Sequence, residues 1–108
     1  MEDFGFQEMQ EMQRKLQKQY EGRWEPVTPQ AARNKMLWMM IEAGEAADII
    51  KKKGDQRIVE EPDTRTHFVE ELADTLMYYN DVMLCYGISV EELKKVYLDK
   101  HQKNMNRW

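Results

Sequence analysis

Apolar side chains recur at steps of three and four residues along most of this chain, and no stretch alternates apolar with polar residues over a strand's length. In the first segment Met9, Met12, Leu16 and Tyr20 follow this spacing, which ends near Gly22. An α-helix brings residues at these steps to one face, whereas a strand requires a period of two. The spacing therefore predicts an all-α fold whose first helix ends near Gly22.

Capping residues and a terminator mark a second helix. Thr28 is a residue type that caps helix N-termini, and Pro29 is favoured at the first helical position. The helix is expected to reach the lysines at 51–53, whose positive charges suit the negative end of the helix dipole, and to stop at Gly54. The polar, proline-containing segment 55–63 is expected to be a loop.

Two more helices follow in the second half of the chain. One is predicted from about Thr64 to Tyr86, with Gly87 as its terminator. Ser89 and Glu92 form the S-x-x-E pattern of a capping box and open the last helix, which runs through "VEELKKVYLDKHQKNMNR".

Four helices with short connections predict a four-helix bundle, and 108 residues suit one domain spanning residues 1–108. The stretches "KMLWMMI" and "LMYYNDVMLCY" are apolar around more of the helix than the interior of so small a chain can cover. A homo-oligomer, dimer or tetramer, would cover the remainder.

Composition excludes several classes of protein. Sixteen Lys and Arg against twenty Asp and Glu give a net charge of -4, which argues against binding a nucleic-acid polymer. The single cysteine, Cys85, excludes an intramolecular disulfide and suits a reducing compartment. The start "MEDFGFQEMQ" lacks the features of a signal peptide, and no apolar run approaches the length of a membrane span. We therefore expect a cytoplasmic protein without membrane contact.

Carboxylates interrupt the apolar faces of both central helices. Glu42 and Glu45 share a face with Trp38, and Glu71 and Asp74 are one turn apart on the next helix. If the faces meet, the like charges require protonation, basic partners or divalent cations. All-oxygen ligands favour Mg²⁺ or Mn²⁺, ions that can hold the oxygens of a phosphate chain. Such pairs are also common on solvated surfaces, so a non-enzymatic oligomerisation or adaptor module is the alternative interpretation.

The same residues carry a resemblance to a known family. "EAGEAADI" followed by "EELADTLMY" resembles the E-x-x-E…E-x-x-D signature of the MazG-like all-α nucleoside triphosphate pyrophosphohydrolases, which include dimeric dUTPases, dCTP pyrophosphatases and phosphoribosyl-ATP pyrophosphatase. The ending "KHQKNMNRW" resembles the K-x-x-x-N-x-x-R-aromatic motif of the dCTP pyrophosphatase branch, which it matches at Lys100, Asn104, Arg107 and Trp108. Further matches are Trp24, Arg33, Asn34, Gly44 and Tyr78.

The resemblance implies a reaction and its cofactor. Glu42, Glu45, Glu71 and Asp74 would be the catalytic carboxylates and would bind Mg²⁺, with Mn²⁺ as a possible substitute. A water would attack the α-phosphorus of a nucleoside triphosphate and release a nucleoside monophosphate and pyrophosphate. Glu45 is our choice for the carboxylate that orients or deprotonates this water. The implied role is to remove non-canonical or surplus nucleotides, with phosphoribosyl-ATP as an alternative substrate.

The resemblance also implies residues that contact the substrate. Lys100, Asn104 and Arg107 lie on one face of the last helix and would contact successive phosphates. Tyr78 would contact the sugar or a phosphate, and Trp24 or Trp38 would stack on the base. Lys52, Val27 and Thr28 stand where the dCTP-type branch usually has an aromatic residue and a histidine, so the resemblance indicates no preferred base. The full set of expected substrate contacts is Lys100, Asn104, Arg107, Tyr78, Trp24, Asn34 and Trp38.

Overall fold

Residues 3–107 are described by the computed structural model, and this part of the chain is helical without a strand. The all-α prediction is confirmed, although the described residues form five helices and not four. The helices are α1 (Phe6–Gln19), α2 (Ala32–Lys53), α3 (Asp55–Glu60), α4 (Pro62–Cys85) and α5 (Val90–Met105).

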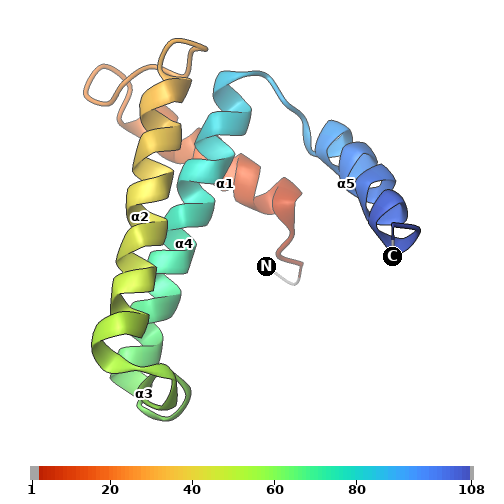
Figure 1. Ribbon diagram of the computed structural model, residues 1–108. Coiled ribbons are helices and arrows are strands. Elements are labelled where there is room, and N and C mark those ends of the chain that lie inside the picture. The colour runs from red at the N-terminus through yellow and green to blue at the C-terminus, as the bar shows by residue number, and fades with distance from the viewer. Residues whose placement is uncertain (1–2, 108) are drawn as a thin grey trace.

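The centre of the fold is an antiparallel pair of long helices. α2 and α4 lie side by side over most of their length, and the short α3 connects them at one end (Figure 1). α1 crosses α4 near the opposite end of the pair. This pairing turns one face of α2 toward one face of α4, so residues far apart in the sequence meet between them.

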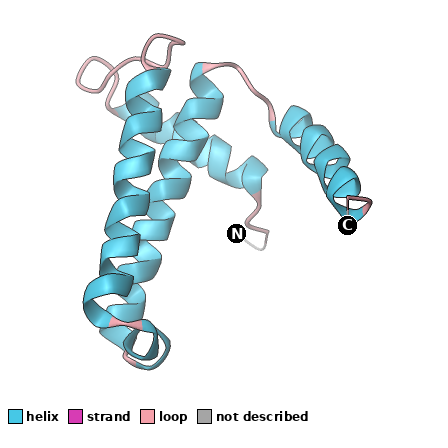
Figure 2. Cartoon of the chain, viewed as in Figure 1, coloured by secondary structure: helices cyan, strands magenta, loops and turns pink. Residues whose placement is uncertain are grey.

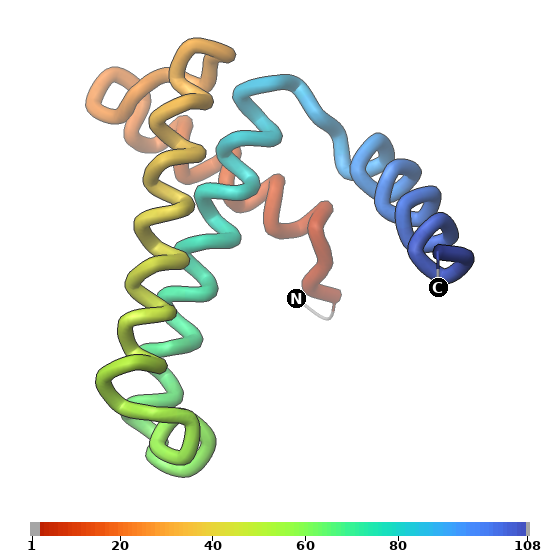
Figure 3. The backbone as a smooth tube through the Cα atoms, viewed as in Figure 1, coloured from red at the N-terminus to blue at the C-terminus, as the bar shows by residue number. Residues whose placement is uncertain are grey.

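The last helix stands apart from the central pair. Among the described helices α5 contacts α1 alone, and the backbone tube in Figure 3 shows it displaced from α2 and α4. A single chain therefore does not close the predicted four-helix bundle, because its fourth long helix does not pack along the other three.

The start of α2 differs from the prediction. The helix begins at Ala32 and not at Pro29, because residues 29–31 form a turn that precedes it. Thr28 stabilises that turn, since its backbone oxygen and its Oγ1 both accept from Ala31 N, at 3.1 and 3.4 Å. Thr28 is thus a cap for the turn before the helix and not for the helix itself.

The prediction of a loop over residues 55–63 was wrong. Most of this segment is α3, which Figure 2 draws as helix at the end of the central pair. α4 begins at Pro62, two residues before the expected Thr64. Asp55 lies in the first turn of α3, where a carboxylate interacts favourably with the helix dipole. Pro62 occupies the first turn of α4, the part of a helix that tolerates proline.

Three other helix ends follow the predicted chemistry, whereas α5 ends at Met105 and not at the expected Arg107. α2 ends at Lys53, and Gly54 has a φ of 86°, a conformation that a residue with a Cβ adopts at a cost. Gly87 has a φ of 66° just after α4. Ser89 Oγ accepts from Glu92 N at 3.1 Å, so the predicted cap of α5 is confirmed.

The buried interior is small and partly polar. In α1 the buried side chains are Gln10, Gln13 and Gln17, whereas Met12 of the predicted apolar stripe is 50 % exposed. Buried apolar side chains are Ala31, Ala32, Ala46, Ile49, Met83 and Cys85. Large apolar side chains remain exposed on α2, α4 and α5, among them Met36, Leu37, Met40, Ile41, Val69, Leu72, Leu76, Val96, Tyr97 and Leu98.

Across the described residues, none of the helices combines the length and the apolar character needed to cross a lipid bilayer.

Candidate metal centre and adjoining cavity

Three carboxylates from the two central helices converge between them. Glu42 and Glu45 of α2 and Glu71 of α4 each offer an oxygen, and the three oxygens lie within 4.8 Å of one another. We call these residues the acidic cluster. Glu42 and Glu71 are partly buried, whereas Glu45 is exposed. Glu42 and Glu45 are three residues apart and so lie on one face of α2, and the pairing of α2 with α4 brings this face against Glu71.

Burial and like charges perturb the acidic cluster. Partial burial, reinforced by the carboxyls of Glu71, Glu45 and Asp74, raises the pKa of Glu42 from its ordinary 4.5 to about 7. Burial also raises the pKa of Asp74, with Glu71 and Glu70 adding to the effect. Asp74 lies outside the group of three oxygens, one turn further along α4. Ionising all of these carboxyls together is therefore unfavourable without a compensating cation.

Two details bear on which cation fits. Glu71 Oε2 is buried and has no hydrogen-bond partner among the described residues, so a ligand position is left unused. The oxygens are hard ligands of the kind that Mg²⁺ and Mn²⁺ prefer. The residues present therefore fit a hard divalent cation.

His67 is a neighbour of the cluster to which the sequence analysis assigned no role. Its Nε2 lies 3.3 Å from Glu71 Oε1, one helical turn away on α4. The i,i+4 spacing of the two residues was the available signal. A protonated His67 would stabilise the Glu71 carboxylate, and a neutral one could hold its orientation by a hydrogen bond.

A cavity of about 550 Å³ adjoins the acidic cluster. Its walls come from α1, the connection after α1, α2 and α4, and Glu42 and Asp74 lie in its lining. Trp38 and Tyr78 form one aromatic side of the cavity, in edge contact with their ring centroids 5.8 Å apart. Burial, with the nearby carboxylates, raises the pKa of Tyr78, so its hydroxyl stays protonated and can donate a hydrogen bond. We call this space the α2–α4 cavity.

Trp24 also lines the α2–α4 cavity, from the connection between α1 and α2. Its ring stacks on Tyr20 with centroids 4.4 Å apart and planes 10° from parallel. The structure thus brings Trp24, Trp38 and Tyr78 to one cavity, although they come from three different segments of the chain.

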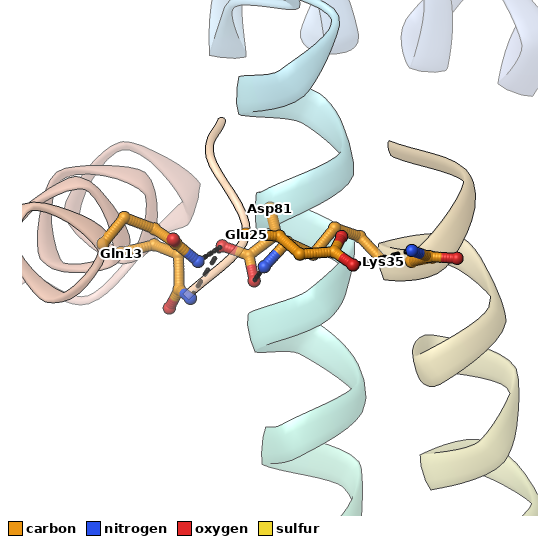
Figure 4. Close-up of polar contacts among 6 residues, drawn as sticks. Gln13, Glu25, Lys35 and Asp81 are labelled. Atoms are coloured by element: carbon orange, nitrogen blue, oxygen red, sulfur yellow. Dashed lines mark hydrogen bonds and ion pairs between the residues drawn. The ribbon is translucent and has the colours of Figure 1, made fainter. Parts of the chain in front are cut away.

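A buried polar network lies at the side of the cavity where α1 crosses α4 (Figure 4). Asp81 Oδ1 accepts from Gln13 Nε2 at 2.8 Å and from Gln17 Nε2 at 2.9 Å. Asp81 Oδ2 lies 4.0 Å from Lys35 Nζ, and Lys35 and Asp81 are each 2 % exposed. Burial raises the pKa of Asp81, although the two glutamines and Lys35 favour its charged form.

This network was not predicted, although the sequence carries signals for it. Asp81 is a lone acid within the apolar run "LMYYNDVMLCY", and an isolated charge in such a run usually has a buried partner. Gln10, Gln13 and Gln17 recur at helical spacing, as a buried polar face does.

Several predicted substrate contacts lie away from the cavity. Lys100 and Asn104 are exposed on α5, Arg107 follows that helix, and none of the three lines the α2–α4 cavity. Asn34 is exposed and donates from Nδ2 to Glu25 Oε1 at 2.7 Å. Trp108 lies outside the described residues. The roles of these residues toward a substrate stay predictions.

A larger hollow of about 900 Å³ lies between the end of α1 and the connection from α4 to α5. No residue of the acidic cluster lines it, so we place the candidate chemistry in the smaller cavity.

Comparison of the chain with known protein families, with curated proteins and with solved structures found no match.

Proposed function

We propose that the protein is a Mg²⁺-dependent nucleoside triphosphate pyrophosphohydrolase of the MazG-like type. The observation that carries the proposal is the convergence of three carboxylate oxygens within 4.8 Å, beside a cavity of about 550 Å³. A metal site alone would suit many proteins. Its position next to an aromatic-walled cavity large enough for a nucleoside favours a nucleotide as the ligand.

The residues have distinct roles in this proposal. Glu42, Glu45, Glu71 and Asp74 would hold Mg²⁺, which supplies positive charge for the phosphate oxygens and lowers the pKa of a bound water. Glu45 is the most exposed of the acidic cluster, which suits a carboxylate that orients or deprotonates an attacking water from solvent. Water attack at the α-phosphorus breaks its bond to the bridging oxygen, and pyrophosphate leaves with that oxygen.

The nucleoside would occupy the α2–α4 cavity. Trp38 and Trp24 offer ring faces or edges to a base, and the protonated Tyr78 hydroxyl can donate to the sugar or a phosphate. Burial, reinforced by the neighbouring carboxylates, raises the pKa of that hydroxyl and keeps it a donor.

A homo-oligomer is part of the proposal. Large apolar side chains such as Met40, at 63 % exposed, and Tyr97, at 68 % exposed, lie on α2 and α5, and a partner copy would cover them. Association could also supply the predicted phosphate contacts from another copy, namely Lys100 and Asn104 of its α5 helix and Arg107, which follows that helix. Light scattering coupled to size-exclusion chromatography tests the association, and a monomer at micromolar concentration would contradict it. We place the protein in the cytoplasm, where the single thiol of Cys85 stays reduced.

The deciding experiment measures pyrophosphate release from canonical and modified nucleoside triphosphates, with Mg²⁺ and with EDTA. We expect metal-dependent formation of monophosphate that is reduced at least 100-fold in Glu45→Gln. The matched control is Glu91→Gln, which removes an exposed charge from α5, away from the acidic cluster and Asp74, and should retain activity. Absence of turnover on every triphosphate would refute the proposal. Turnover of phosphoribosyl-ATP alone would instead assign the related reaction, and unchanged behaviour of the variant in all assays would favour an adaptor module.

A further inference from the structure

Lys35 has hydrogen-bonding capacity that the residues described by the structure do not use. Its side chain is 3 % exposed, and its Nζ lies 4.0 Å from Asp81 Oδ2, further than a hydrogen bond reaches. The Trp38 ring lies on another side, with its centroid 5.5 Å from Nζ. Gln13 and Gln17 already donate to Asp81. An amine with three donor positions is therefore held in the lining of the α2–α4 cavity with donors to spare.

Glu25 provides the complementary group in the same cavity. Its Oε1 accepts from Asn34 at 2.7 Å, which holds the carboxylate in place. Its Oε2 is buried and has no hydrogen-bond partner among the residues that the structure describes. A buried acceptor without a donor is unfavourable in the free protein, so a ligand that donates to it gains affinity.

The distance along α2 between Lys35 and the acidic cluster matches the length of a nucleoside, and Glu25 lines the same cavity. Lys35 precedes Glu42 by seven residues, which places it two turns away on the same face of α2 and about 10 Å along the helix axis. One ligand can therefore reach Lys35 and Glu25 with one end and the acidic cluster with the other. The aromatic rings of Trp38, Tyr78 and Trp24 line the space between.

We propose that Lys35 and Glu25 are the specificity-determining residues that bind the hydrogen-bonding edge of a nucleobase, an inference that rests on the proposed function. Lys35 donates to a ring carbonyl or ring nitrogen, and Glu25 Oε2 accepts from an adjacent ring N–H or amino group. Enzymes that bind an unpaired base combine such edge contacts with aromatic stacking. Asp81 acts as a positioning residue, because its carboxylate lies 4.0 Å from Lys35 Nζ and is itself held by hydrogen bonds from Gln13 and Gln17.

The first test is Glu25→Gln, which keeps the size of the side chain. Its amide oxygen can still accept from Asn34, so its NH₂ group presents a donor where the wild type presents an acceptor. We expect the order of preference among adenosine, guanosine, cytidine and uridine to change, with the best wild-type nucleoside losing about 10- to 100-fold in affinity. Glu21→Gln, an exposed carboxylate in the same connection, is the matched control.

The second test is Lys35→Met, with Lys51→Met at the exposed end of α2 as its control. We expect KM for nucleotides to rise about 10- to 100-fold while kcat changes less than threefold, because Lys35 lies away from the reacting phosphorus. Circular dichroism and thermal unfolding establish that each variant is folded. A structural defect alone would lower kcat and affinity for every base by the same factor.

Two measurements separate this inference from the proposed function. Nucleoside binding is followed by tryptophan fluorescence in EDTA, where no hydrolysis is required, and hydrolysis is followed separately with Mg²⁺. If the wild type hydrolyses triphosphates but Glu25→Gln loses affinity equally for all bases, the inference is overturned and the proposed function stands. If the wild type binds nucleosides selectively and Glu25→Gln changes the order of preference, but no triphosphate is hydrolysed, the proposed function is refuted and the inference stands. A wild type that binds no nucleoside would overturn the inference.

Discussion

Replacing Glu42 by Gln should stabilise the protein when metal is removed. Partial burial and the neighbouring carboxyls raise the pKa of Glu42 from 4.5 to about 7, so the folded protein holds this proton more tightly than the unfolded chain does. The wild type in EDTA should therefore lose stability as the pH rises from about 4.5 to about 7, and the loss should be complete above pH 7. Glutamine cannot ionise, so the variant avoids this part of the loss.

The magnitude follows from the same pKa. At about 1.4 kcal/mol per pKa unit, a rise of this size corresponds to about 3 kcal/mol for a fully buried group. Glu42 is only partly buried, and solvent screens its repulsion with the other carboxylates. We therefore expect Glu42→Gln to raise the free energy of unfolding by about 1–2 kcal/mol at pH 8 in EDTA and to change it little at pH 4.5.

Urea unfolding at pH 4.5 and pH 8, at one fixed protein concentration, measures this difference. Glu91→Gln is the control, since its carboxylate is exposed on α5 away from the acidic cluster and Asp74, and its effect should stay within about 0.5 kcal/mol. Adding Mg²⁺ at pH 8 should stabilise the wild type more than Glu42→Gln, because binding to the folded state alone adds to its stability. A variant no more stable than the wild type at pH 8 in EDTA would refute the argument that these carboxyls repel one another.

Three further predictions concern the fold. Asp81→Ala should lower the free energy of unfolding in urea by about 3–5 kcal/mol, because it leaves Lys35 buried without its ion partner. The double variant Lys35→Met/Asp81→Leu should recover part of that loss, and a double variant less stable than Asp81→Ala would contradict this reasoning. Ser89→Ala should cost about 1 kcal/mol and speed amide hydrogen exchange in the first turn of α5, since the cap to Glu92 N is lost, whereas unchanged exchange there would argue against the cap. Gly54→Ala should destabilise the protein by about 1 kcal/mol because the φ of Gly54 is 86°, and Gly44→Ala within α2 should stabilise it by a similar amount. Thermal unfolding measures both changes in stability, and changes of the same sign would be inconsistent with a backbone effect.

Local chemistry was sufficient to predict several elements of this fold. The end of α2 at Gly54, the end of α4 before Gly87 and the cap of α5 at Ser89 all depend on residues within one turn of the helix end. The all-α class follows from spacing that each segment shows by itself. The loop prediction over 55–63 was wrong because a helix of six residues is too short for periodicity to reveal it.

The sequence by itself determined that Glu42 shares a face with Glu45, and Glu71 with Asp74, because one helical turn sets each pair. Only the tertiary structure decided that Glu71 meets the α2 pair, that Asp81 meets Gln13 and Lys35, and that α5 stands apart from the central helices. The segments that form these contacts are up to 68 residues apart in the chain. Their meeting depends on how whole helix faces pack, and the spacing of residues along a single helix carries no information about the face that packs against it.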